Sequence, residues 1–315
     1  MGTSLENAAR PPVRLPLARD LARNKGLYLM VLPVLLYYFL FHYMPMYGAL
    51  IAFKDFSPAR GILGSAWADP WYKHFVDFFG SFYFVRVLAN TVFISLNSLL
   101  FSFPAPILLA LLLNELKVRW FSRTVQTMTY MPHFVSLVVF CGLVREFTMD
   151  SGFINQILAL FGWKPVTMLS RPELFVPVYV ISDIWKEVGW GSIIYLAALT
   201  SIDPQLYEAA RIDGASRLAQ TWYVTLPGIA STVVIILILR LGHIMNVGFE
   251  KIILLYNPSI YSSADVISSF VYRKGLLEFN WSSSAAVGLF NSVINFSFLL
   301  SANWISRKLK NTSLW

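Results

Sequence analysis

Four side chains that could bind a ligand recur at helical spacing inside an apolar run. They are Asp183, Lys186, Glu187 and Trp190, at i, i+3, i+4 and i+7, with Trp185 adjacent to them. This spacing places the four on one face of a helix. Carboxylates can bond sugar hydroxyls, and an indole ring can cover the apolar face of a pyranose. An internal ion pair of Lys186 with Asp183 or Glu187 is the alternative, and the pattern favours neither interpretation.

Polar residues also interrupt two later apolar runs. Arg240 and His243 share a helical face, and Asn291 and Asn295 lie one turn apart. Ionisable groups in a membrane span are costly to bury and usually face a protein interior or a water-filled path. We therefore add these four residues to a candidate substrate pathway, in which Arg240 and Lys186 could attract an acidic sugar. Interhelical hydrogen bonding is the default interpretation of the two asparagines.

Transmembrane helices are the elements that must hold these side chains. The 315-residue chain is 57% hydrophobic and 13% charged, which is too apolar for an ordinary soluble domain. A hydrocarbon core of about 30 Å requires about 20 apolar residues per helix. Six windows qualify, approximately at residues 27–52, 87–113, 125–144, 175–199, 229–248 and 285–305. The predicted fold class is an all-α membrane protein with six transmembrane helices.

Basic residues cluster beside the spans and predict the orientation of the chain. The three clusters are Arg10, Arg14, Arg19, Arg23 and Lys25; Lys117, Arg119 and Arg123; and Arg307, Lys308 and Lys310. With six spans all three fall on one side, which the positive-inside rule makes cytoplasmic. Both termini and the loop at residues 201–228 are then cytoplasmic. This distribution explains the net charge of +8 without nucleic acid as a partner.

The domain organisation follows from these spans. We expect a cytoplasmic tail at residues 1–26, one six-span domain at 27–305 and a second tail at 306–315. The single cysteine, Cys141, excludes an internal disulfide and a cysteine metal cluster. The sequence also lacks a phosphate-binding loop, a His-Glu-x-x-His pair and a nucleophile elbow. No catalytic residue, metal ligand or cofactor of this chain is predicted, so another chain must bind any ATP that is used.

The cytoplasmic loop has the pattern of a short helix, a glycine and a second short helix. Asp203 suits an N-cap and Pro204 the first helical position. Gly214 can take the left-handed conformation that ends such a helix. Ala209 and Ala210 are small enough to let another surface approach, while Glu208 offers a carboxylate to an arginine. The loop is therefore predicted to dock a soluble partner, with an amphipathic interfacial helix pair as the alternative.

The spacing in this loop resembles the EAA signature of binding-protein-dependent ABC importer permeases. Glu208-Ala209-Ala210 is followed by three residues, Gly214, nine residues and Val224-Thr225-Leu226-Pro227. Members of that family more often carry isoleucine where this chain has Val224. In the family the loop is a coupling helix that inserts into a cleft of an ATPase subunit. The resemblance implies that Glu208, Ala209, Ala210 and Gly214 are the docking residues.

Other segments are similar to permeases for complex oligosaccharides and polysaccharides, including plant uronides and alginate. They are Phe41 to Gly48, Ile51 to Phe56, Gly189-Trp190-Gly191, Asn246 to Glu250 and Ser313-Leu314-Trp315. The resemblance implies the type I ABC importer architecture in the lipid of a bacterial inner membrane. It also implies a heterodimer with a second six-span permease, two ATPase subunits carrying ATP and Mg, and an external solute-binding protein that delivers a saccharide.

Two other functions are compatible with some of these residues. An ion-coupled secondary transporter could use Asp183, Lys186 and Glu187, and a membrane-embedded glycosyl-transfer enzyme could use the paired carboxylates. Neither function accounts for the helix-Gly-helix loop in the cytoplasm.

Overall fold

The computed structural model describes residue 21 and residues 23–310 of the 315-residue chain. Most of the predicted tail at 1–26, including Arg10, Arg14 and Arg19, lies outside the described residues, as does the Ser313-Leu314-Trp315 segment. The chain divides into two compact units, residues 1–50 and 51–315. Each unit is described by itself.

The first unit consists of helical segments that run into one another. They are α2 (Lys25–Tyr38), the π-helical η1 (Phe39–Tyr43), α3 (Met44–Met46) and the start of the 3-10 helix η2 (Tyr47–Phe53). The resulting 29-residue helix, Lys25–Phe53, is long and apolar enough to cross a membrane. It corresponds to the first predicted span.

The second unit begins with a small folded segment that precedes its first long helix. It contains β1 (Lys54–Asp55), α4 (Gly61–Gly64), β2 (Ala66–Trp67) and α5 (Lys73–Phe79), with β1 antiparallel to β2. The buried Lys54 ammonium donates to the carbonyl oxygens of Ile62, Leu63 and Ser65 at 2.8, 3.2 and 3.1 Å. A cation at the carboxyl end of a short helix satisfies carbonyls that would otherwise lack partners.

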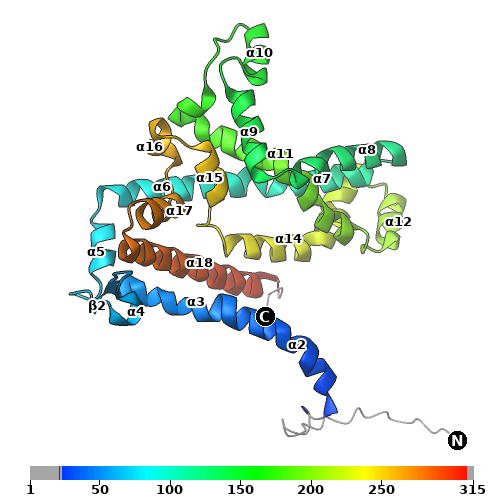
Figure 1. The fold of residues 1–315 in the computed structure, drawn as a ribbon. Helices are drawn as coiled ribbons and strands as arrows, with labels where there is room; N and C mark the ends of the chain where they lie inside the picture. Colours follow the sequence, from blue (N-terminus) through cyan, green and yellow to red (C-terminus); the bar gives the residue numbers. More distant parts are fainter. Residues whose placement is uncertain (1–20, 22, 311–315) are drawn as a thin grey trace, which may run out of the picture. The chain divides into compact units, whose positions relative to one another are not determined.

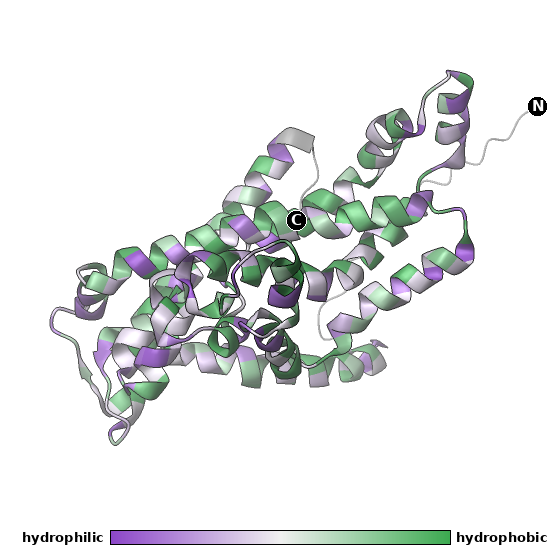
Figure 2. Cartoon of the chain, turned by 90° about the horizontal axis from the view of Figure 1, so that it is seen from above, coloured by the Kyte–Doolittle hydropathy of each residue, from purple (hydrophilic) through white to green (hydrophobic). Residues whose placement is uncertain are grey.

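Three further helices of the second unit are long and apolar enough to span a membrane. One runs from Phe82 to Glu115 through α6 (Phe82–Asn97), the π-helical η3 (Ser98–Ser102) and α7 (Pro104–Glu115). Another, Arg217–Leu241, comprises α13 (Arg217–Gln220), the π-helical η6 (Thr221–Thr225) and α14 (Leu226–Leu241). The third lies in α18 (Trp281–Lys310). Figure 2 shows that hydrophobic residues predominate along the long helices of the chain, with hydrophilic residues among them.

The prediction of one continuous helix over residues 125–144 is wrong. This window contains the end of α8 (Arg119–Tyr130), the 3-10 turn η4 (Met131–Phe134) and the start of α9 (Leu137–Thr148). The two helical parts are bent by 105° at the break. Pro132 has no amide hydrogen to continue the helical ladder, and Val135 is extended. Ser136 then caps α9 by accepting a hydrogen bond from the Val139 amide. The apolar residues at 125–144 therefore belong to two helices, although their hydropathy is that of one span.

The fourth predicted span lies within α11 (Pro172–Leu199), a 28-residue helix that is about 42 Å long at 1.5 Å per residue. Its charged residues distinguish it from the four apolar helices. α11 packs against α7, α8 and α14, so it lies among the other helices of this unit (Figure 1). Four helices, up to five with the bent pair, pass the apolar criterion, and the number six remains a prediction. Apart from the two short strands, the described elements are helical.

Shorter helices connect the long ones. They are α10 (Phe153–Leu160), η5 (Met168–Ser170), α12 (Pro204–Ile212), α15 (Phe249–Leu255), η7 (Pro258–Ile260), α16 (Tyr261–Ala264), α17 (Ile267–Tyr272) and the π-helical η8 (Arg273–Leu277). The largest core cluster joins α9, α11 and α15 through buried residues that include Phe140, Phe175 and Ile252. This packing fixes the position of α15 against the charged part of α11.

A buried ion pair stabilises the connection between α16 and α18. The fully buried Asp265 carboxylate accepts hydrogen bonds from the two terminal nitrogens of Arg273, at 3.1 and 2.7 Å. The Ser269 hydroxyl donates a third bond at 2.8 Å. Burial by itself lowers the pKa of Arg273, but the hydrogen bonds and the charge of Asp265 outweigh it and raise that pKa above its ordinary value. The segment therefore holds a permanent bidentate pair.

Candidate functional site

The loop predicted at residues 201–228 folds as the sequence indicates at both ends of α12. The Gln205 amide donates to the Asp203 carboxylate at 2.9 Å, which makes Asp203 the N-cap. Gly214 has a φ of +76°. Its amide donates to the Arg211 carbonyl at 3.0 Å, and the Ala215 amide donates to the Ala210 carbonyl at 2.9 Å. These two bonds form a Schellman motif, for which glycine is preferred because a side chain is strained at positive φ.

Side-chain hydrogen bonds hold the second half of the loop against the first. The Ser216 hydroxyl caps α13 by accepting from the Ala219 amide at 3.3 Å. The Tyr207 hydroxyl lies 3.1 Å from the Thr225 hydroxyl, so α12 is joined to the segment that leads into α14. The loop is therefore a rigid unit at the end of a long helix.

An ion pair connects this loop to the end of another long helix. The Arg217 guanidinium lies 2.9 Å from the Glu115 carboxylate at the end of α7. A cavity of about 760 Å³ lies beside the pair. Its lining residues are Asn114, Glu115, Leu116, Lys117, Tyr207, Arg211, Arg217 and Gln220.

The outer surface of α12 offers small side chains beside a carboxylate. Glu208 and Ala209 are exposed and Ala210 is half-buried. Two large apolar side chains lie on the same short helix, where Leu206 is 53% and Ile212 is 87% exposed. Exposed apolar side chains grouped on one short helix fit a surface that makes contact with another protein or with the membrane. The structure thus brings three predicted docking residues and Gly214 together on one helix and its closing turn.

Asp183, the first of the α11 residues, lies between two cations. Its Oδ1 is 3.5 Å from the Lys251 ammonium and its Oδ2 is 3.7 Å from the Arg240 guanidinium. The Lys251 side chain is buried, donates to the Tyr179 carbonyl at 2.9 Å and lies 4.3 Å from the centre of the Tyr179 ring. Arg240 also donates to the Ser98 hydroxyl at 3.0 Å. Lys251 was not predicted, because nothing in its local sequence points to α11.

These groups surround a polar pocket of about 320 Å³. His243 lines it from the turn that follows α14, because the helix ends at Leu241 and the predicted helical face shared with Arg240 does not form. The lining residues are Ser95, Ser98, Leu99, Tyr179, Asp183, Arg240, His243, Ile244, Asn246, Val247 and Gly248. The pocket therefore joins α6, α11 and the segment that follows α14. We refer to it as the charged pocket.

Two other charged residues of α11, Lys186 and Glu187, face the broken helix instead. Lys186 donates to the carbonyl oxygens of His133 and Val135 at 3.0 and 3.4 Å, and it lies 3.6 Å from Glu187. Glu187 contacts the His133 ring at 2.8 Å. The Lys186–Glu187 ion pair exists, but Lys186 mainly satisfies carbonyls that the break at Pro132 exposes.

Two tryptophans of α11 differ in their surroundings. Trp190 stacks on the His133 ring with centroids 4.5 Å apart and planes 3° apart, and it is 45% exposed. Trp185 packs against Phe140 and Phe147. Trp190 beside Glu187 has the form of a sugar-binding platform, whereas Trp185 contributes to packing. The predicted single face of α11 is thus divided between the charged pocket and the broken helix.

The asparagines of α18 bind the chain that follows α14. Asn291 and Asn295 donate to the Asn246 side-chain oxygen at 2.8 and 3.1 Å. Asn295 is buried and also accepts from the Met245 amide at 2.9 Å. These bonds hold the irregular segment at the rim of the charged pocket.

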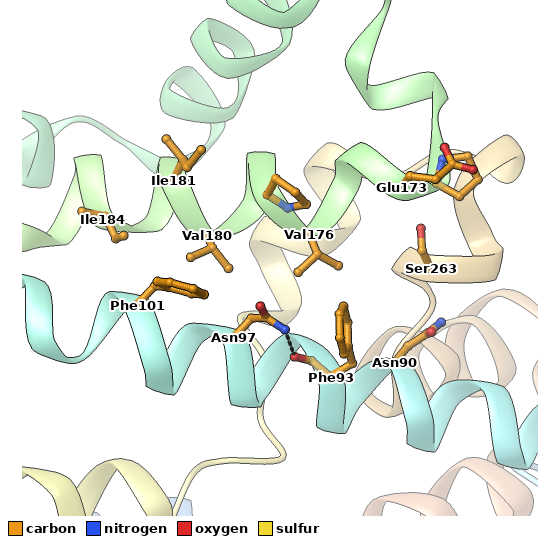
Figure 3. A pocket seen from close by; sticks show the side chains of 12 residues that line it. Asn90, Phe93, Asn97, Phe101, Glu173, Val176, Val180, Ile181, Ile184 and Ser263 are labelled. Atoms are coloured by element: carbon orange, nitrogen blue, oxygen red, sulfur yellow. Dashed lines mark hydrogen bonds between the residues drawn. The ribbon is translucent and has the colours of Figure 1, made fainter.

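An apolar cleft of about 700 Å³ separates α6 and η3 from α11 (Figure 3). Phe93 and Phe101 reach it from one side, Val180 and Ile184 from the other. Asn97 donates to the Phe93 carbonyl of its own helix at 2.8 Å. The cleft offers mainly hydrophobic contacts, in contrast to the charged pocket. Across the described residues, no group of three or more His, Cys, Asp or Glu side chains is arranged to hold a metal ion.

Residues 102–311 match the family of binding-protein-dependent transport system inner membrane components. The chain belongs to this family. The match covers two thirds of the chain and includes the α12 loop and the α11 and α14 sides of the charged pocket, while Ser95, Ser98 and Leu99 of its lining precede the matched residues. It confirms the predicted class of ABC importer permease and the location in an inner membrane.

Two relatives in Bacillus subtilis (strain 168) are each 43% identical over 296 residues. One is the protein LplB and the other is the polygalacturonan/rhamnogalacturonan transport system permease protein YteP. In both comparisons the alignment covers 94% of this chain and 92% of the relative. The permease therefore shares nearly its whole length with these proteins.

Solved structures show that the resemblance extends to the fold. A chain of a bacterial ABC transporter involved in the import of the acidic polysaccharide alginate is 44% identical, with a TM-score of 0.86. The comparison covers 93% of this permease and 99% of that chain. A bacterial alginate transporter in complex with alginate pentasaccharide-bound periplasmic protein gives 43% identity and a TM-score of 0.87, covering 95% and 99%. The type I importer architecture is confirmed.

Proposed function

We propose that this permease forms one half of the translocation pore of an importer for oligo- or polysaccharides, with acidic saccharides as the favoured class. Its relatives transport polygalacturonan or rhamnogalacturonan and alginate, all of which carry uronic acid carboxylates. A second permease forms the other half of the pore. Two ATPase subunits supply ATP and Mg, and an external solute-binding protein delivers the saccharide.

The rigid α12 loop is the observation that carries the coupling part of this proposal. Glu208, Ala209 and Ala210 form its docking surface, and the Gly214 turn holds that surface in place. Since η6 leads into α14, a displacement of the loop by the ATPase dimer moves a membrane helix. That movement switches the pore between inward-facing and outward-facing states. The loop and both chain ends lie in the cytoplasm in this scheme.

The pathway residues fall into two groups according to their contacts. Asp183, Arg240 and His243 line the charged pocket, while Glu187 and Trp190 offer a carboxylate beside an exposed ring. These five residues contact the saccharide in our proposal. The others, Trp185, Lys186, Asn291 and Asn295, support the pathway by holding the helices around it. The permease has no catalytic role in this scheme.

Reversing the charge of Glu208 tests the coupling proposal. Glu208→Arg is expected to abolish co-purification of the ATPase and ATP-driven uptake, because a central interface residue commonly contributes about 2 kcal/mol or more. Asp150→Arg, the same charge change on an exposed loop residue outside the docking surface, is the control and should assemble and transport normally. Full assembly and transport by Glu208→Arg would contradict the proposed docking surface.

The energy source is tested separately. Proteoliposomes with the assembled transporter and the solute-binding protein should take up oligosaccharide only when ATP is supplied. Uptake by this chain alone under a proton or sodium gradient without ATP would support an ion-coupled secondary transporter instead.

A further inference from the structure

Three helices place polar groups of the charged pocket at a similar depth. Counting 1.5 Å per residue, Ser98 lies about 26 Å from the Glu115 end of its helix, Asp183 about 24 Å from Leu199 and Arg240 about 21 Å from Leu226. All three helix ends are on the side of the α12 loop. Counted from those ends, the pocket lies in the half of a hydrocarbon core of about 30 Å that is farther from the α12 loop, where polar groups still need a functional or structural reason.

The charges in the pocket do not balance. Arg240 and Asp183 line the pocket with opposite charges, and the buried Lys251 ammonium, which lies behind the lining at 3.5 Å from Asp183, adds a second positive charge. His243 is the other titratable group in the lining apart from the Tyr179 phenol. A surplus positive charge in a low-dielectric cavity attracts an anion strongly.

The two cations differ in how firmly they are held. The Lys251 side chain is 6% exposed and bonds the Tyr179 carbonyl. The Arg240 side chain is 41% exposed, and its 3.7 Å separation from Asp183 is too long for a hydrogen bond. The bond to the Ser98 hydroxyl involves one terminal nitrogen of a guanidinium that has five donor hydrogens. Arg240 is therefore the cation that an incoming ligand can reach.

The backbone around the pocket is irregular on two sides. Ser98 begins the π-helical η3, and residues 242–248 follow the end of α14 as turns and irregular chain. Irregular backbone at membrane depth is tolerated where protein buries it or where it lines a water-filled cavity. π-Helical segments occur frequently at functional sites. These features fit a ligand site better than a purely structural ion pair.

We propose that the charged pocket is a subsite for the carboxylate of one uronic acid residue, and that Arg240 determines this specificity. The proposal rests on the proposed function and extends it to a single group. A guanidinium binds a carboxylate through two parallel hydrogen bonds. Asp183 offsets the positive charge when the subsite is empty, and its loose contact with Arg240 allows the uronate to take its place. The volume of about 320 Å³ is at the small end of ligand pockets and suits one sugar ring of a longer chain.

The test compares an acidic saccharide with its neutral counterpart. Substrate-stimulated ATP hydrolysis is measured in proteoliposomes that contain the complete transporter with its solute-binding protein. The two probes are a galacturonate oligosaccharide and the same oligosaccharide with its carboxylates methyl-esterified, each at saturation of the binding protein. Arg240→Gln should reduce stimulation by the acidic probe about tenfold or more, which is the size of a lost hydrogen bond to a charged group. Stimulation by the ester should stay within about twofold of wild type, because the uncharged ester makes no ion-paired hydrogen bond to Arg240 that the substitution could remove.

Two further variants control for charge and folding. Arg171→Gln removes one positive charge from an exposed site at the start of α11 and should leave both probes unaffected. Arg240→Lys keeps the charge without the planar fork and should recover part of the acidic response.

The outcomes distinguish the uronate subsite from the broader proposal that the transporter imports acidic saccharides. An equal loss with both probes, or an unchanged acidic response in Arg240→Gln, would overturn the subsite while the importer of acidic saccharides stands. A wild-type transporter that responds to the ester and to neutral oligosaccharides but not to the acidic probe would overturn both.

Discussion

The α12 loop and the charged pocket are both polar regions in an apolar protein, and they are held together in opposite ways. In the loop, most hydrogen bonds join residues two to five positions apart, such as Asp203 to Gln205 and Ala210 to Ala215. Two longer contacts, Tyr207 to Thr225 and Arg217 to Glu115, hold the finished loop in place. In the pocket, Arg240 contacts Ser98, 142 positions away, and Lys251 contacts Asp183, 68 positions away. The loop is therefore built locally, whereas the pocket exists only while several helices keep their positions.

This difference suits the two tasks proposed for the regions. A part that transmits force between subunits should keep its shape, and the loop has a cap and a Schellman turn that maintain it. A substrate site in an alternating-access transporter should change as helices move. The charged pocket has ion pairs of 3.5 and 3.7 Å shared among three elements, so small helix displacements alter them.

The largest effect expected on either region comes from removing the Asp183 carboxylate. Asp183→Asn should lower the free energy of unfolding by about 3 kcal/mol, because the buried Lys251 ammonium then lacks its counter-charge. The measurement is the midpoint temperature of thermal unfolding of the detergent-solubilised chain, compared between wild type and Asp183→Asn. The double variant Asp183→Asn with Lys251→Met removes one cation as well and should recover much of the loss. If the double variant loses as much as both single variants added together, the pairing does not stabilise the pocket.

A smaller effect is expected from straining the loop at Gly214. Gly214→Val should cost about 1–3 kcal/mol, because a β-branched residue is strained at the φ of +76°. A β-carbon at Gly214 would meet no atom within 4 Å, so the cost arises from the backbone conformation alone. We expect faster amide hydrogen exchange over residues 204–220 and weaker ATPase association. Gly214→Asn, which tolerates the left-handed conformation, is the matched control. Equal exchange rates in both variants would show that the turn does not need this conformation.

The same contrast explains what could be predicted from the sequence. The Asp203 cap and the Gly214 turn were predictable because each depends on residues within one or two helical turns. The separation of Asp183 from Lys186 and Glu187 was not predictable. Helical spacing shows that these residues share one face, but it does not show which neighbouring helix each of them contacts. Lys251 was missed for this reason, as its partner is brought near only by packing of α15 against α11.

The break in the third predicted span shows a different limitation. Hydropathy averages over a window, so the apolar residues on both sides of Pro132 scored as one helix. Proline within such a window was a usable signal, because it removes a helical hydrogen bond and restricts the residue before it. The role of Lys186 at this break could not be predicted, since it depends on carbonyl oxygens more than 50 positions away.

The smallest effect is expected at the Arg217–Glu115 pair, which joins the α12 loop to the end of α7. Its side chains are 62% and 44% exposed, so the pair should contribute at most about 1 kcal/mol to stability. Its influence on coupling can still be measured as saccharide molecules transported per ATP hydrolysed. Arg217→Glu should lower this ratio without changing the thermal midpoint, because it loosens the loop from α7. The charge-swapped double variant Arg217→Glu with Glu115→Arg should restore it, and high salt should remove the difference between variants. If the swapped pair transports no better than Arg217→Glu alone, the contact does not link the loop to α7, and the loop acts on the membrane domain through α14.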